Sequence, residues 1–146
     1  MLINKVHKLL YCILLSFSLI SCYTKIHQTI EQKIYIDNIV LNIYIDDMRA
    51  KLKLIEIEEE KAFFIYATII IDNVSERNGS FELQKIRLCH NEKIISTITY
   101  YDTFVSFLMQ PIGIQKGERK IYKIYWVVNK KYEKLLFSND LKVVYE

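Results

Sequence analysis

The sequence predicts an all-β protein, a single antiparallel β-sandwich of about seven strands. Three observations predict it. Apolar and polar residues alternate with a period of two in several stretches, as in a strand with one buried face. β-branched and aromatic residues are abundant, including 11 tyrosines and 7 phenylalanines among 146 residues. Short runs rich in Asn, Asp, Ser and Gly separate these stretches, and they predict turns.

The first strands are predicted on either side of Asp37-Asn38. Apolar residues occupy every second position from Ile39 to Ile45. Ile34 and Ile36 also alternate, but in the opposite phase. This change of phase predicts a bulge or tight turn at Asp37-Asn38.

Residues 46–61 (DDMRAKLKLIEIEEEK) allow two interpretations. They include good helix formers, and Asp46 or Asp47 could cap a helix. The same stretch contains KLKLIEIE, which alternates as a strand does. We favour a hairpin that turns at Glu58 to Lys61, and the helix is the alternative.

The stretch from Ala62 to Asp72 (AFFIYATIIID) predicts the strongest strand, since it is apolar on both faces, as at the centre of a sandwich. In the following run, 73–80, Asn78-Gly79 is a hairpin-type signal. Residues 81–88 predict a strand with a change of phase near Gln84-Lys85. A turn at 90–93 then precedes a strand expected at 94–101.

The last third of the chain predicts a loop, two strands and a short helix. Residues 110–118 (QPIGIQKGE) hold the only proline and two of the three glycines, so we expect a loop. A strand is expected at 121–128, with alternate residues on one face, namely Tyr122, Ile124, Trp126 and Val128. Apolar residues at helical spacing predict a short helix near 129–137, and 141–145 predicts a final short strand.

The first 22 residues have the composition of a secretory signal peptide. Lys5 and Lys8 precede the uncharged, largely apolar run from Leu9 to Ile20. This run is shorter than the roughly 20 residues of a membrane-spanning helix. The chain has no alanine before Ala50, so it lacks the usual small-residue cleavage site.

Leu19-Ile20-Ser21-Cys22 resembles the lipobox of bacterial lipoproteins. The resemblance implies that the Cys22 thiol receives a diacylglyceryl group and that a signal peptidase cuts between Ser21 and Cys22. It also implies that the new amine is often acylated, for example with palmitate. Residues 1–21 would then be a cleaved signal peptide. An uncleaved anchor and an ordinary signal are the alternatives.

Residues 22–32 are expected to be a lipidated tether, and residues 33–146 the folded domain. The stretch YTKIHQTIEQ (residues 23–32) is polar and lacks strong periodicity. Ten extended residues reach about 33 Å, enough to lift a domain clear of the lipid headgroups. The domain is long enough for one hydrophobic core. Its strand pattern resembles small immunoglobulin-like sandwiches of exported bacterial proteins, a likeness of fold that says little about function.

The charge balance argues against two kinds of binding, and the cysteine content argues against an internal disulfide. After removal of residues 1–21, 18 basic and 17 acidic residues remain. This balance argues against nucleic-acid binding and against a polybasic membrane patch. With Cys12 removed and Cys22 acylated, Cys89 cannot form an internal disulfide. We expect Cys89 to be a small buried hydrophobe rather than a free or intermolecularly linked thiol.

The chain carries no recognisable catalytic or cofactor motif. His90 follows Cys89, but zinc needs three or four ligands and no others are near in sequence. Neighbouring residues on a strand point to opposite faces, so the pair is not expected to act as nucleophile and base. The acidic run Glu58 to Glu60 lacks the spacing of a calcium loop. We therefore expect no enzyme activity, metal or cofactor.

One aromatic stretch predicts a surface for a protein partner. Residues 100–109 (YYDTFVSFLM) are too apolar for both strand faces to be buried at the edge of a fold. The candidate contact residues are Tyr101, Phe104, Phe107 and Met109. The alternative is that both faces are covered within the domain.

The sequence therefore predicts a lipoprotein anchored through Cys22 to the cell membrane or outer membrane, facing the periplasm or exterior. Its expected function is a non-enzymatic binding or docking module with an unknown protein partner. A hydrolase acting on the envelope and a purely structural envelope lipoprotein are the alternatives.

Overall fold

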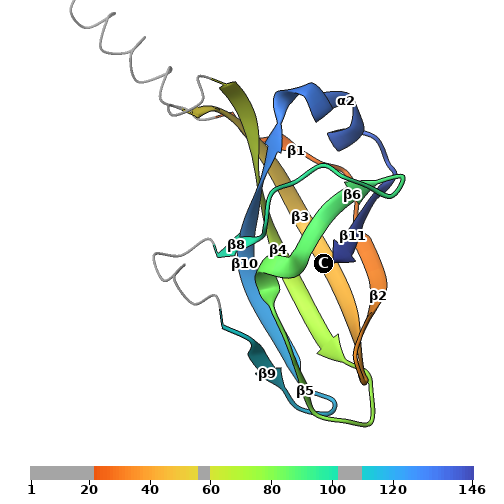
Figure 1. Cartoon of the computed structure of the whole chain (residues 1–146). Helices are drawn as coiled ribbons and strands as arrows, with labels where there is room; N and C mark the ends of the chain where they lie inside the picture. The colour runs from red at the N-terminus through yellow and green to blue at the C-terminus, as the bar shows by residue number, and fades with distance from the viewer. Residues whose placement is uncertain (1–21, 56–59, 102–109) are drawn as a thin grey trace, which may run out of the picture.

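The computed structural model describes residues 22–55, 60–101 and 110–146, and it is a sandwich of antiparallel sheets with one short helix. The predicted all-β sandwich is therefore confirmed. Figure 1 shows the long strands of one sheet running the length of the molecule, with the shorter strands packed across them. The likeness to immunoglobulin-like domains stays a prediction.

The large sheet has six strands. Five of them follow the order β1-β3-β4-β10-β8, and β2 also pairs with β3. All these pairs are antiparallel. Its strands are β1 (Thr24–Lys25), β2 (Ile30–Ile36), β3 (Ile39–Ile55), β4 (Glu60–Asn73), β8 (Tyr100–Tyr101) and β10 (Arg119–Asn129).

A smaller sheet with the order β11-β6-β7 covers one face of the large sheet, and β5 and β9 form a separate pair. The remaining elements are β5 (Gly79–Phe81), η1 (Leu83–Lys85), β6 (Ile86–His90), β7 (Lys93–Ile94), β9 (Ile112–Ile114), η2 (Lys130–Tyr132), α2 (Glu133–Leu136) and β11 (Leu141–Tyr145). The described residues thus form eleven strands rather than about seven, because five strands have only two or three residues. The short helix expected near 129–137 is confirmed as η2 and α2.

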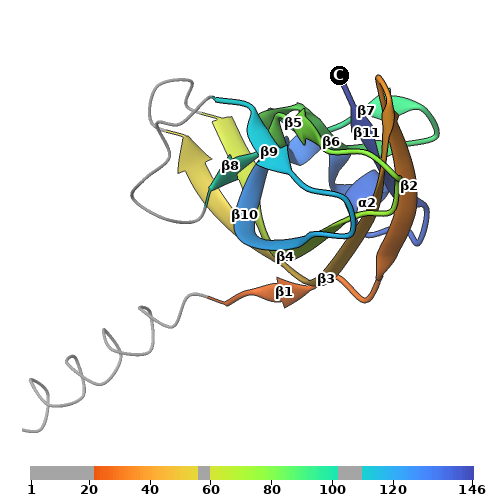
Figure 2. The ribbon, with the colours of Figure 1, turned by 90° about the horizontal axis from the view of Figure 1, so that it is seen from below.

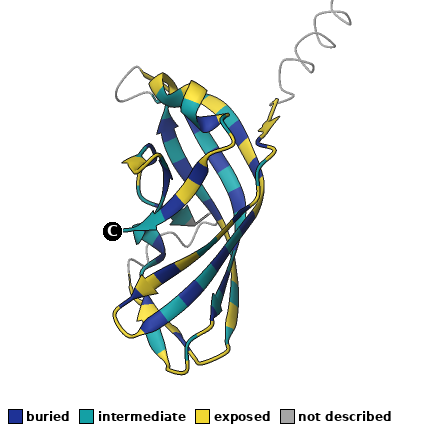
Figure 3. Cartoon of the chain, turned by 90° about the vertical axis from the view of Figure 1, so that its right-hand side faces the viewer, coloured by how far each residue is buried: buried dark blue, intermediate teal, exposed yellow. Residues whose placement is uncertain are grey.

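The core lies between the inner face of the large sheet and the small sheet. Figure 3 shows buried and less buried residues alternating along the long strands. Fully buried side chains include Ile43, Ile69, Trp126, Leu88 and Val143. Each apolar side chain of this size contributes about 1.5–3 kcal/mol on burial.

The single tryptophan keeps its polar group satisfied inside this core. Trp126 Nε1 lies 2.6 Å from Thr99 Oγ1 and 2.9 Å from the carbonyl oxygen of Ile86. Because a buried N–H without a partner is costly, Thr99 and the backbone of β6 make this position suitable for tryptophan.

The turn predicted at Asp37-Asn38 is confirmed. Ile36 pairs with Ile39, so Asp37 and Asn38 form a two-residue turn, with Asp37 at φ 48°. The described residues of 46–61 are paired strands of β3 and β4, so the helical alternative is wrong for them. The connection itself, 56–59, lies outside the described residues.

The structure corrects the details of that hairpin. Glu60 already pairs with Ile55, so Glu60 and Lys61 belong to β4 and not to the turn. The register of β3 shifts between Asp46 and Arg49, where Asp47 adopts φ 53°. The two aspartates therefore form a β-bulge rather than a helix cap.

Asn78-Gly79 does not form the expected hairpin. The chain leaves β4 at Asn73 and reaches β5, which pairs with β9 from the segment predicted to be a loop. Gly79 is needed there because a Cβ would lie 2.5 Å from Cγ2 of Ile39. The glycine signal therefore reflects a close approach to β3.

The strand expected at 94–101 is also corrected. Only the short strands β7 and β8 form, joined by a segment in which Ser96 bridges to Val128. The Ser96 hydroxyl accepts a hydrogen bond from the backbone N–H of Leu88, at 2.9 Å. This segment passes from the small sheet to the edge of the large sheet, so one continuous strand cannot form.

The expected tether is largely part of the folded domain. β1 pairs with Arg49 and Ala50 of β3, and β2 starts at Ile30 rather than after residue 32. Ile26 and Ile30 are each only 4% exposed. Their burial outweighs the polar character of their neighbours, and among the described residues only Cys22 and Tyr23 precede the first strand.

Candidate docking surface

The outer face of the large sheet is the most unusual surface of the molecule. Viewed along the strands, the small sheet and α2 lie on the inner side of the large sheet (Figure 2). The outward residues of β4 and β10 include Phe64, Tyr66 and Tyr125, which are all half-buried. Large aromatic side chains on a sheet face that the small sheet and α2 leave uncovered are typical of a binding surface.

Five aromatic residues form a continuous row across this face. The ring centroids are 5.8 Å apart for Tyr23 and Tyr66, 5.8 Å for Tyr66 and Tyr125, and 5.0 Å for Tyr125 and Tyr100. Phe64 stacks on Tyr125 at 5.9 Å. We call these residues the aromatic row: Tyr23, Phe64, Tyr66, Tyr100 and Tyr125.

The row follows from the register of the sheet. Tyr66 of β4 is directly opposite Tyr125 of β10, and Tyr125 is opposite Tyr100 of β8. Directly opposed residues of antiparallel strands have adjacent side chains, so the aromatic rings meet. Each such pair adds about 0.5–1.5 kcal/mol beyond burial, which keeps the row ordered.

Lysines of β3 lie over the aromatic rings. Lys53 Nζ lies 4.3 Å from the centroid of the Phe64 ring and donates a hydrogen bond to the Tyr66 hydroxyl at 2.8 Å. Lys51 Nζ lies 5.5 Å from the centroid of Tyr23. Lys51 and Lys53 form no ion pair with other described residues.

The arginines of the same face are neutralised by aspartates. Arg49 pairs with Asp47 at 2.6 Å, and Arg119 pairs with Asp72 at 2.6 Å. Hydrogen bonds from these arginines are the main reason that the pKa of each aspartate lies below its ordinary value. The positive charge offered beside the aromatic row therefore comes from the lysines.

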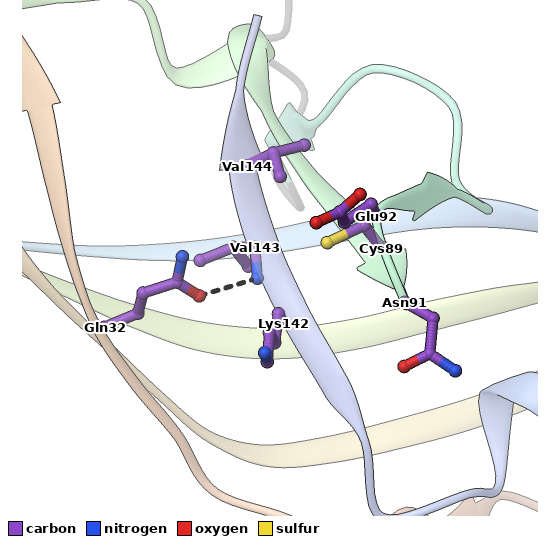
Figure 4. A pocket seen from close by; sticks show the side chains of 7 residues that line it. All are labelled: Gln32, Cys89, Asn91, Glu92, Lys142, Val143 and Val144. Atoms are coloured by element: carbon purple, nitrogen blue, oxygen red, sulfur yellow. Dashed lines mark hydrogen bonds between the residues drawn. The ribbon is translucent and has the colours of Figure 1, made fainter.

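A second candidate is an open pocket of about 530 Å³ between β2 and β11. Gln32 lies on one side of β11, and Cys89 and Glu92 lie on the other (Figure 4). Cys89 is 2% exposed, which confirms the prediction of a buried side chain. Burial raises the pKa of the thiol more than the charge of Lys142 lowers it. A nucleophilic cysteine needs a lowered pKa, so the pocket does not suit thiol catalysis.

His90 does not line this pocket, although it follows Cys89 in the chain. Its Nε2 lies 4.0 Å from Oδ2 of Asp140. Within residues 22–55, 60–101 and 110–146, no group of three or more His, Cys, Asp or Glu side chains could hold a metal ion.

Most of the predicted partner residues cannot be compared with the structure. Phe104, Phe107 and Met109 lie outside the described residues, and for Tyr101 only the backbone pairing with Ile124 is described. The aromatic row ends at Tyr100, immediately before this segment. The sequence analysis did not identify the rest of the row, although Phe64, Tyr66 and Tyr125 stand at alternate positions between buried residues.

The predicted lipidation site, Cys22, is exposed at the start of the described chain, and residues 1–21 lie outside it. No described helix is long and apolar enough to cross a membrane. Comparison with protein-family models, with curated proteins and with solved structures found no match.

Proposed function

We propose that this chain is a bacterial lipoprotein, anchored through Cys22 to the cell membrane or outer membrane, and that it acts as a non-enzymatic docking module. The observation that carries the docking role is the aromatic row with its two lysines on the uncovered face of the large sheet. The partner is a protein segment with acidic and apolar side chains.

The chemistry of the row suits such a segment. Tyrosine offers a large contact area at a low cost in conformational entropy and is enriched in binding hot spots. Lys51 and Lys53 supply charges that an acidic partner would neutralise, and Tyr66 adds a hydroxyl group. The row lies across the paired strands β4, β10 and β8, so the contact surface is rigid before the partner binds.

The alternative of an envelope hydrolase needs polar groups that converge in a deep pocket. The pocket between β2 and β11 is open, and its only thiol has a raised pKa. A purely structural lipoprotein needs no binding surface, so the aromatic row favours the docking function over both alternatives.

Photo-crosslinking in the native membrane tests the proposal. A benzophenone amino acid at Tyr66 would report contacts of the row, and the same probe at Tyr35 is the control because Tyr35 is 75% exposed and lies far from the row. We expect one protein product at Tyr66 whose crosslinked peptide is acidic. The double substitution Lys51→Glu and Lys53→Glu should reduce its yield several-fold.

Equal yields from the probes at Tyr66 and Tyr35, or a product that is insensitive to the charge reversal, would contradict the docking function. Circular dichroism of each variant would confirm that the fold is retained. Intact mass of the native protein, which should start at residue 22 and carry diacylglycerol, tests the anchor separately.

A further inference from the structure

We propose that one end of the domain rests in the headgroup region of the membrane that holds Cys22. This end, the anchor end, comprises Tyr23, Leu52, Leu54 and Phe137. The inference rests on the lipid anchor of the proposed function. It goes beyond that function because it assigns a lipid-contacting surface and a fixed orientation to the folded domain.

The first argument is the length of chain between the anchor and the fold. Tyr23 alone separates Cys22 from β1, whose residues pair with β3. The backbone N–H of Ile26 donates to the carbonyl oxygen of Met48 at 2.9 Å, so the chain stays bonded to β3 beyond the end of β1. Two residues of extended chain span at most about 7 Å. A lipid on Cys22 therefore brings this part of the sheet to the membrane interface.

The second argument is where apolar side chains are exposed. Seven large hydrophobic side chains are exposed in the described part of the chain, and four of them belong to the anchor end. Their exposed fractions are 47% for Tyr23, 43% for Leu52, 59% for Leu54 and 38% for Phe137.

The four side chains share one end of the molecule. Leu52 is opposite Phe63 in the sheet, and the Phe63 ring contacts the Phe137 ring edge-on, with centroids 5.7 Å apart. Tyr23 contacts Tyr66 on the other side of the same strands. In Figure 1, β1, α2, the end of β3 and the start of β4 all lie in the upper part of the molecule.

The third argument is the chemistry around this apolar surface. Tyrosine is enriched at membrane–water interfaces, and lysine can place its ammonium group among lipid phosphates while its stem covers apolar surface. Lys61 is opposite Leu54 in the sheet, and Lys134 lies in α2, three residues before Phe137. The apolar side chains of the anchor end need no charged headgroup, so this end should also rest on a neutral lipid surface.

Depth-dependent fluorescence quenching tests the inference. The full-length lipidated protein, in a Cys89→Ala background, carries a fluorophore on Leu54→Cys and is reconstituted in phosphatidylcholine vesicles with nitroxide-labelled lipids. The matched control carries the fluorophore on Tyr35→Cys. Tyr35 pairs with Val40, ten residues from Ala50 along β3, a separation of roughly 33 Å. We expect quenching at Leu54 to exceed quenching at Tyr35 several-fold.

A variant with a longer linker distinguishes apolar contact with the lipid from simple tethering through Cys22. Ten Gly and Ser residues inserted between Cys22 and Tyr23 would let the domain leave the surface. If the apolar contacts hold the domain, quenching at Leu54 persists in this variant, and replacing both Leu52 and Phe137 with Gln reduces it to the control level. Loss of quenching by the insertion alone would overturn the apolar contact.

Three other outcomes would each overturn a different part of the inference. A lipidated protein in which Leu54 and Tyr35 are quenched equally would overturn the orientation while leaving the anchor intact. An intact mass without lipid would overturn the proposed anchor and this inference together. Energy transfer between labelled copies, without quenching by lipid, would assign the anchor end to a dimer contact and overturn the lipid contact.

Discussion

The two faces of the large sheet are made by the same strands but by different classes of side chain. On the inner face of β4, Ile65, Ile69 and Ile71 are fully buried. On its outer face, Phe64, Tyr66 and Ile70 are only half-buried. A step of one residue therefore separates positions that stabilise the fold from positions of the proposed docking surface. The apolar run of 62–72 contains both kinds of position.

The largest expected effect compares two neighbouring isoleucines. Ile69→Ala empties a fully buried position between β3 and β10, so it should reduce the free energy of unfolding by about 2–5 kcal/mol. Ile70→Ala, on the outer face, should cost less than about 1 kcal/mol. Urea denaturation of both variants measures the difference. Equal losses would show that the outer face is packed as tightly as the inner face.

The next effect concerns Asn73, a polar residue on the inner side that is 2% exposed. Its Nδ2 donates to the carbonyl oxygens of Arg77 and Gln115 at 2.7 and 3.0 Å, and its Oδ1 accepts from the backbone N–H of Ser75 at 3.1 Å. Asn73→Ala should cost about 1–3 kcal/mol because it leaves buried backbone groups unpaired. Denaturant unfolding measures the loss. Asn73→Asp keeps the acceptor but loses both donors, so it should not restore the stability.

A smaller effect is expected where β2 meets β11. Gln28 donates to the carbonyl oxygen of Leu141 at 2.8 Å and accepts from its N–H at 3.1 Å, whereas Gln32 only accepts, from the N–H of Val143 at 3.1 Å. Gln32→Glu should therefore be nearly neutral. Gln28→Glu should cost about 1 kcal/mol, since it replaces a donor with a second acceptor. Thermal unfolding at neutral pH compares the two, and an equal shift in Tm would contradict these assigned roles.

The smallest effect is a pH dependence on the outer face. The hydrogen bond from Arg119 holds the pKa of Asp72 below its ordinary value in the folded protein. The resulting stability is present above the unfolded pKa, near 3.8, and is lost as the pH falls through the lower folded pKa. Because the pair is partly exposed, it should contribute less than about 1 kcal/mol. Urea titrations at neutral and acidic pH should show the difference between wild type and Asp72→Asn shrinking in acid.

Sequence periodicity predicted the parts of the fold that depend on local pattern. Alternation over 39–45 and 121–128 identified β3 and β10, and the change of phase located the turn at Asp37-Asn38. Ile26 and Ile30 would share one face of a strand, but the polar Gln28 occupies the position between them on that face. No run of alternating apolar residues therefore indicated their burial. The pairing of β5 with β9 was missed because each strand has only three residues and the partners are distant in the chain.

The candidate site was less predictable than the fold. The aromatic row brings together residues of β4, β8 and β10 with Tyr23, and their proximity depends on the order and register of the strands. A single sequence shows which outward positions are aromatic, but it does not show which strands are neighbours. The sequence therefore indicated a binding role without identifying these residues.

The shared edge of β3 has a consequence for aggregation. One edge of this 17-residue strand pairs with β4, and the other is divided between β2, over Ile39–Ile45, and β1, at Arg49–Ala50. Unpaired strand edges recruit strands from other chains and start fibrils. The segment that follows Cys22 therefore protects the longest described strand from self-association, and a protease that removed residues 22–36 would expose that edge as a template for aggregation.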